Sequence, residues 1–140
     1  MTPKDFDLYL ESMQKKITSI LKSKAGEYAM DNDRFHNFKT ASRINEETPA
    51  KAAWGMATKH LISVQDLIEH RLELSKPMIA EKFIDMINYL ILISAMLEEE
   101  LYAKQKYEKK QKAIQRKKKK TTERNRAKRK GNNTDTERSN

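Results

Sequence analysis

The distribution of helix-breaking residues constrains the fold of this 140-residue chain more than any other sequence feature. Gly occurs only at positions 26, 55 and 131, and Pro occurs only at positions 3, 49 and 77. Residues 78–130 contain neither, and the sequence has no run of alternating β-branched residues. Because Gly and Pro are the residues least compatible with a helix interior, so few of them predict an all-α protein.

Helical periodicity divides the chain into four segments. Thr2 followed by Pro3, and Thr48 followed by Pro49, are typical helix starts, since Thr caps a helix and Pro suits its first position. We expect a short helix around residues 39–45 and a last helix that begins near Ser75. In the third helix, an arc of about 80° at 100° per residue holds the apolar side chains and predicts its core-facing side. These side chains are Trp54, Ala57, Leu61, Val64, Ile68 and Leu72.

The last helix is predicted to lie at the centre of the fold. From Phe83 to Leu97 it carries a single charge, Asp85, and its apolar residues point in nearly every direction. A helix that is apolar all round needs neighbours on every side. We therefore expect a four- to five-helix bundle with a buried central helix. Since one short chain supplies few covering helices, we also expect a homo-oligomer, either a dimer or a tetramer.

The charge is divided unevenly between the body of the chain and its C-terminal tail. Residues 101–140 hold 16 Lys/Arg and 4 Asp/Glu, whereas the first 100 residues hold 13 and 16. We predict a helical domain over residues 1–101 and a basic tail over residues 102–140, which is partly helical and then disordered after Gly131. Such a tail binds nucleic acid through phosphate contacts, without reading sequence. The alternative is a solubilising tail with no dedicated partner. The basic residues concerned are Arg116, Lys117, Lys118, Lys119, Lys120, Arg124, Arg126, Lys128, Arg129 and Lys130.

Two broad classes of protein are disfavoured by composition. The chain has no Cys, which rules out a disulfide framework and fits a reducing compartment. Its longest apolar run, Leu90 to Ile93, is too short to span a bilayer. We therefore expect no membrane association and a cytoplasmic location, which is the host cytoplasm if the protein is phage-encoded.

Asp85 raises the main chemical question, because an unpaired charge buried among apolar residues is strongly disfavoured. Glu81, Asp85 and Asn88 are spaced i, i+4 and i+7, within a sector of about 60°. Asp66 and Glu69 also share one side of the preceding helix. If the two helices form an antiparallel hairpin, four carboxylates converge on a divalent cation, and hard oxygen ligands favour Mg²⁺ or Mn²⁺.

Simpler interpretations of these acids remain open. Asp66 and Glu69 lie opposite the apolar arc, where a polar face is usually solvated. Glu81 falls in a first helical turn, where acids are common because of the helix dipole. Asp85 can instead pair with a buried cation such as Lys59.

The segments "DLIE" and "EKFIDMINYLIL" resemble the acidic motifs of the all-α nucleoside triphosphate pyrophosphohydrolases, the MazG-like and dimeric dUTPase superfamily. Small phage-encoded members are the most similar. The resemblance implies a Mg²⁺-dependent enzyme that cleaves an NTP or dNTP to the monophosphate and pyrophosphate. It implies catalytic metal ligands at Glu81 and Asp85, a first acidic pair at Asp66 and Glu69, and a further candidate ligand at Glu27. Lys82 stands where the family usually has a second Glu.

Further residues are candidates for holding a nucleotide substrate. Lys24, Arg34, Lys39 and Lys59 are candidate phosphate donors, and Asn37 or Asn88 is a candidate reader of the base edge. Phe35, Phe38 and Trp54 are candidates for stacking on the base, although each is also a natural core residue. The alternative function is a non-catalytic helical protein that sequesters a nucleotide or docks on nucleic acid or on a protein. A purely structural role is the third hypothesis.

Overall fold

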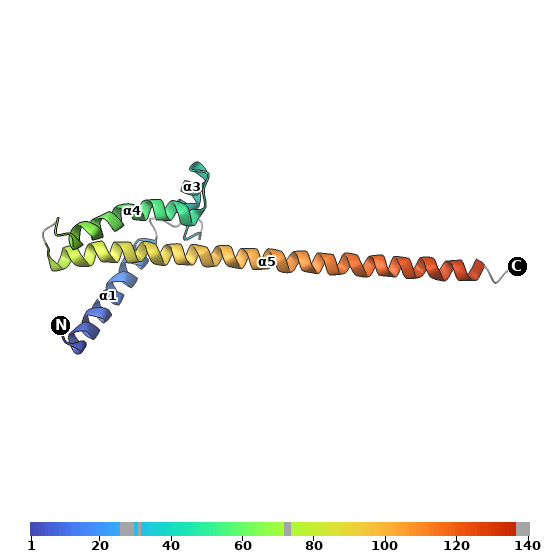
Figure 1. The fold of residues 1–140 in the computed structure, drawn as a ribbon, viewed down its shortest axis with the longest axis horizontal. Helices are drawn as coiled ribbons and strands as arrows, with labels where there is room; N and C mark the ends of the chain where they lie inside the picture. The colour runs from blue at the N-terminus through green and yellow to red at the C-terminus, as the bar shows by residue number, and fades with distance from the viewer. Residues whose placement is uncertain (26–29, 31, 72–73, 137–140) are drawn as a thin grey trace. The chain divides into compact units, whose positions relative to one another are not determined.

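The structure is a computed structural model that describes residues 1–25, 30, 32–71 and 74–136, with side chains described as far as Asn125. These residues form four helices, α1 (Pro3–Ser23), α3 (His36–Ile44), α4 (Pro49–Ile68) and α5 (Lys76–Thr136), as Figure 1 shows. The described part of the chain contains no strand, only an isolated bridge between Met30 and Asp33. The prediction of an all-α protein is therefore confirmed.

The two predicted Thr-Pro helix starts are also confirmed. The Thr2 hydroxyl accepts from the Asp5 backbone N–H at 3.2 Å, and the Asp5 carboxylate accepts from the Thr2 backbone N–H at 3.0 Å. The Thr48 hydroxyl accepts from the Lys51 backbone N–H at 3.3 Å. These bonds satisfy N–H groups that have no partner within the first turn of a helix.

The chain divides into two compact units, Met1–Glu98 and Glu99–Asn140. The first unit contains α1, α3, α4 and the beginning of α5, and the second contains the remainder of α5. Within the first unit, α4 and the beginning of α5 run in opposite directions (Figure 1). This is the antiparallel arrangement that the sequence analysis considered.

The core of the first unit lies where α3, α4 and α5 meet. Phe38, Ala53, Leu92 and Met96 form a buried cluster, and Leu21 at the end of α1 packs against it. Phe38 is the largest fully buried side chain of the described residues. Ala52, Ala53 and Ala57 of α4 are also buried. Because the distance between packed helices depends on the side chains at their contact, these alanines permit a close approach.

The side of α4 that faces the core differs from the predicted one. Trp54, Leu61 and Ile68 belong to the predicted arc but are 48%, 43% and 65% exposed. Ala57 belongs to the predicted arc and is buried, whereas the other buried positions, Ala52, Ala53 and Leu67, lie on a neighbouring strip of the helix. The predicted side was therefore only partly right, because Phe38 of α3 supplies the bulk of the core and α4 supplies small residues. Leu72 lies outside the described residues.

Helix α5 buries only one side within the single chain. Ile84, Asn88, Leu92 and Met96 recur every four residues and are all buried. Leu90, Ile91 and Leu97 are about half exposed, at 47%, 42% and 51%. One chain therefore does not surround the helix, which is the incomplete cover that the sequence analysis expected of a single short chain.

The second unit is helical further than predicted. Helix α5 extends to Thr136, beyond Gly131, where we expected disorder to begin. Lys, Arg, Gln and Ala, which dominate this segment, are good helix formers, and no Pro interrupts it. Among the helices described here, none is long and apolar enough to cross a membrane.

The position of Phe38 predicts a large loss of stability when its ring is removed. Phe38→Ala should lower the free energy of unfolding by about 3–5 kcal/mol, because the truncation leaves a cavity between three helices. Urea denaturation followed by circular dichroism measures the change. Ile44→Ala on the same helix is the control, since Ile44 is 76% exposed and its truncation should have little effect. Equal losses for the two variants would contradict this description of the core.

Candidate functional site

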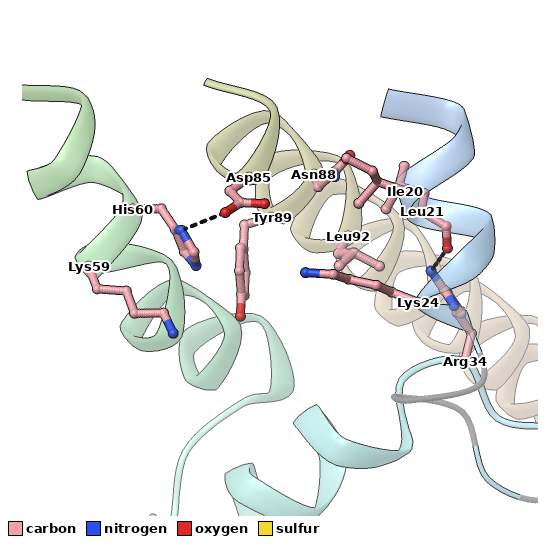
Figure 2. A pocket seen from close by; sticks show the side chains of 10 residues that line it. All are labelled: Ile20, Leu21, Lys24, Arg34, Lys59, His60, Asp85, Asn88, Tyr89 and Leu92. Atoms are coloured by element: carbon pink, nitrogen blue, oxygen red, sulfur yellow. Dashed lines mark hydrogen bonds and ion pairs between the residues drawn. The ribbon is translucent and has the colours of Figure 1, made fainter. Parts of the chain in front are cut away.

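A pocket of about 110 Å³ opens between α1, α4 and α5 in the first unit. Figure 2 shows its lining, which comes from the end of α1, from the segment before α3, from the middle of α4 and from α5. The lining is mostly polar and basic. Its residues are Ile20, Leu21, Lys24, Arg34, Lys59, His60, Asp85, Asn88, Tyr89 and Leu92.

Asp85 lies in this pocket, and its partner is His60. The His60 Nδ1 atom is 3.5 Å from the Asp85 Oδ2 atom, and both side chains are largely buried, at 17% and 23% exposure. The His60 ring also packs on Tyr89, with ring centroids 5.1 Å apart. The sequence analysis named Lys59 as a possible buried cation for Asp85, but the side chain in contact with Asp85 is His60.

His60 is held mainly in its neutral form. Burial lowers the pKa of the His60 imidazole below its ordinary value of 6.5, and the nearby Lys59 and Lys24 lower this pKa further. Asp85 acts in the opposite direction but does not reverse the shift. A neutral imidazole has one N–H donor and one acceptor nitrogen. His60 therefore offers the pocket a hydrogen-bonding group at neutral pH rather than a charge.

Three permanent cations share the pocket lining with the single carboxylate. Lys24, which follows α1, and Lys59 of α4 lie on opposite sides of Tyr89 in Figure 2. Arg34 donates from Nη2 to the Leu21 backbone oxygen at 2.7 Å, which fixes its guanidinium at the edge of the pocket. The pocket thus carries more positive than negative charge, although the first 100 residues have 13 Lys/Arg and 16 Asp/Glu.

Two polar atoms of the lining are buried without a hydrogen-bond partner among the described residues. These are the Arg34 Nη1 atom, a donor, and the Asn88 Oδ1 atom, an acceptor. Asn88 is 7% exposed. A buried polar group with no partner costs roughly 1–3 kcal/mol, so such atoms are rare in folded proteins. Their presence in one pocket points to a ligand that accepts from the arginine and donates to the asparagine.

The other predicted metal ligands do not converge on Asp85. Arg71 binds Asp66 at 3.2 Å and also pairs with Glu69, while Glu81 pairs with its neighbour Lys82 at 2.8 Å. Within the described ranges, no group of three or more His, Asp or Glu residues is placed to hold a metal ion. These side chains therefore do not fit a Mg²⁺ centre as they are arranged. Glu27, the further candidate ligand, lies outside the described residues, and the Mg²⁺ requirement stays a prediction.

The predicted substrate-binding residues fall into two groups. Lys24, Arg34, Lys59 and Asn88 line the pocket together. Asn37 and Lys39 belong to α3 and are not part of the pocket lining. The Lys39 Nζ atom is 3.0 Å from Asp33, whose carboxyl pKa is lowered first by the Phe35 backbone N–H and then by Lys39.

The aromatic residues predicted to stack on a base are placed differently. Phe38 is 1% exposed and belongs to the core, and Phe35 packs against that core. Trp54 is 48% exposed but does not line the pocket. Tyr89 is the aromatic side chain of the pocket, and the sequence analysis did not select it.

His60 is the second pocket residue that was missed. The positions 53, 57, 60, 64 and 67 are spaced by four, three, four and three residues, which is the spacing of a helix seam. Ala53, Ala57 and Leu67 on this seam are buried, and His60 occupies its middle. A search for seams of small residues, rather than for the bulkiest apolar arc, would have identified His60.

Comparisons of this chain with known family models, curated proteins and solved structures find no match. The function is therefore argued from the pocket and its chemistry.

The environment of His60 predicts its titration. In an NMR titration of the full chain, the His60 pKa should lie below 6.5, because burial disfavours the imidazolium ion. Asp85→Asn should lower this pKa further by removing the carboxylate that attracts the imidazolium ion. A His60 pKa above 7 would contradict the description, since it would mean that the ion pair outweighs burial.

The same shift makes stability depend on pH in a defined direction. Because the folded chain binds a proton at His60 less readily than the unfolded chain, His60 destabilises the fold as pH falls through the unfolded value of 6.5. Urea denaturation at pH 7.5 and 5.5 should therefore reveal a larger loss of stability for the wild type than for His60→Gln.

Proposed function

We propose that the first unit binds a phosphate-bearing small molecule, most naturally a nucleotide, with its phosphate in the pocket between α1, α4 and α5. The observation that carries the proposal is the meeting of Lys24, Arg34 and Lys59 around one pocket in an otherwise acidic unit. Cations from three separate elements repel one another without a bound anion. Hydrogen bonds between such groups and phosphate are charge-assisted and strong.

The unpartnered atoms support the same class of ligand. A phosphate oxygen would accept from the Arg34 Nη1 atom, which has no other partner in the described structure. The Asn88 Oδ1 atom requires a donor, such as a hydroxyl or an amino group of the ligand. A nucleotide carries both kinds of group. An anion that carries no hydrogen atom, such as sulfate, would satisfy only the arginine.

The size of the pocket limits which part of a nucleotide it encloses. Its volume of about 110 Å³ is well below the range of roughly 300–1,000 Å³ that is typical of sites enclosing a whole drug-sized ligand. We therefore propose that the pocket encloses the phosphate end together with the group that donates to Asn88, and that the rest of the nucleoside extends outside the described lining. This function fits the cytoplasmic location expected from the sequence.

Neutralising the pocket cations should weaken phosphate binding selectively. Lys24→Gln and Lys59→Gln should each lower the affinity for nucleoside triphosphates by about tenfold or more, since a charge-assisted hydrogen bond is worth roughly 1.5–3 kcal/mol. Isothermal titration calorimetry of the full chain measures the change. Lys51→Gln, at an exposed position of α4 outside the pocket, is the matched control. If all three variants bind equally, phosphate binding at this pocket is excluded.

The second candidate function is the pyrophosphohydrolase activity that the sequence resemblance implies. Asp85 favours it, because this carboxylate lines the same pocket as the three cations that would hold the phosphates. In that position it would orient a water molecule toward a phosphorus atom and accept its proton. The cations would stabilise the charge that develops on the phosphate oxygens. A Mg²⁺ ion, or Mn²⁺, remains part of this proposal as an expectation from the resemblance.

Hydrolysis is tested with a panel of NTPs and dNTPs in the presence of Mg²⁺, with pyrophosphate release as the readout. The wild type should release pyrophosphate from at least one substrate, and Asp85→Asn should abolish release while leaving nucleotide affinity nearly unchanged. Glu11→Gln on the exposed side of α1 serves as the control. If nucleotides bind but no substrate is hydrolysed, the pyrophosphohydrolase activity is excluded and the nucleotide-binding function remains.

We further propose that the chain forms a homodimer, which would complete the expected bundle around α5. The exposed sides of Leu90 and Ile91 border a groove on this helix that Ile87, Ser94, Ala95 and Glu98 also line. An apolar strip of this kind on one unit is typical of a surface that is covered by a partner. A second copy offers the same strip, and a two-fold axis would pair the strips with each other.

A charge on this strip should separate the subunits. The full-length wild type should sediment as a dimer in analytical ultracentrifugation, and Ile91→Glu should sediment as a monomer, because the dimer would bury unpaired carboxylates. Ile44→Glu places the same charge on the exposed surface of α3 and should stay dimeric. A wild type that sediments as a monomer at all concentrations would contradict the proposal.

A further inference from the structure

The second unit carries a dense positive charge on an exposed helix. From Lys109 to Thr122, α5 contains eight Lys/Arg residues and no Asp or Glu. All eight side chains are exposed, as is Arg124, while the side chains from residue 126 onward are outside the description. The predicted nucleic-acid-binding residues with described side chains, Arg116 to Lys120 and Arg124, all belong to this exposed surface.

The charge is concentrated on one side of the helix. At about 100° per residue, seven of the eight basic residues fall within one half of the helix circumference, and Lys118 is the exception. We call this half the basic face. Its residues in this segment are Lys109, Lys110, Lys112, Arg116, Lys117, Lys119 and Lys120. The opposite half is mainly neutral between Ala103 and Thr122. It holds Ala103, Tyr107, Gln111, Ile114, Gln115, Thr121 and Thr122 beside the charged Lys104, Glu108 and Lys118.

The basic face has two edges, each formed by residues seven positions apart. Lys112 and Lys119 lie along one edge, and Lys110 and Lys117 lie along the other, about 160° away around the helix. Lys109, Arg116 and Lys120 lie between the edges. The α-helix has a diameter of about 10–12 Å and the major groove of B-DNA is about 12 Å wide. A helix lying in that groove meets a row of phosphates on each side, and the two edges match this arrangement.

We propose that the basic face of α5 binds duplex DNA in the major groove, through phosphates on both walls and without sequence preference. Lys side chains on the edges reach phosphates, which fix position but carry no base identity. An anionic membrane surface is the other polyanion that a basic helix can bind. Membrane binding requires a strongly apolar face opposite the charges, and here that face has only Ala103, Tyr107 and Ile114 as apolar residues.

The test relocates charges without changing composition or net charge. The test variant exchanges Gln111 with Lys112 and Gln115 with Arg116, which moves two charges from the basic face to the neutral half. The matched control exchanges Gln105 with Lys106 and Lys109 with Ala113, which moves two charges but keeps both within the basic face. Fluorescence anisotropy with two unrelated 30-base-pair duplexes, at several salt concentrations, measures the affinity of each full-length protein.

The wild type and the control should bind both duplexes with equal affinity and with the same steep dependence on salt. The test variant should bind at least about tenfold more weakly, and its salt slope should be smaller by about two, since each phosphate contact contributes about 0.9. Equal affinity for all three proteins would overturn the proposal, because it would mean that charge acts without regard to helix side. Tighter binding to phosphatidylserine vesicles than to either duplex would overturn it in favour of a membrane surface.

Discussion

The packing of α4 against α5 is the contact on which both the core and the pocket of the first unit depend. Ala53 of α4 is completely buried in a cluster with Leu92 and Met96 of α5, and Phe38 of α3 belongs to the same cluster. His60 follows Ala57 on the same seam of α4. The packing that buries Ala53 therefore also brings His60 to 3.5 Å from Asp85 and its ring to 5.1 Å from that of Tyr89.

The same contact explains how a carboxylate is accommodated in the most apolar segment of the chain. Asp85 retains 23% of its side-chain exposure, and it lies at the pocket rather than in the cluster of Phe38, Ala53, Leu92 and Met96. A neutral imidazole touches it, and Lys24, Lys59 and Arg34 line the same pocket. The contact with His60 and the partial exposure therefore accommodate the carboxylate without enclosing it in hydrocarbon.

The sequence predicted the helices better than it predicted their faces. Thr2 and Thr48 marked helix starts because capping is a local interaction that involves only a few neighbouring residues. The orientation of α4 depends on Phe38, which lies on another helix, and the pattern of α4 alone favoured Trp54 and Leu61. The residues of the candidate site show the same difference between local features and contacts between helices. Lys24, Arg34, Lys59 and Asn88 were selected by residue type, whereas His60 and Tyr89 become site residues only through packing.

The acidic residues illustrate the limit of motif spacing. Asp66 and Glu69 have the spacing of a ligand pair, but Arg71, two positions after Glu69, pairs with both. Glu81 likewise pairs with its neighbour Lys82. Helical spacing can show that two carboxylates share a side of a helix. It cannot show whether a cation of the same chain reaches them first, because that depends on the conformation at the helix ends.

Phosphate is proposed to bind at the pocket rather than at the basic tail, and NMR can localise the bound phosphate directly. Inorganic pyrophosphate would be titrated into the isotope-labelled full-length protein, with backbone amide and side-chain shifts followed residue by residue. If phosphate binds at the pocket, the chemical shifts of His60, Asn88, Tyr89 and the Arg34 side chain should change in a saturable way. These changes should occur at pyrophosphate concentrations below those that affect the second unit. Shifts confined to residues 104–124, with the pocket resonances unchanged, would contradict this proposal.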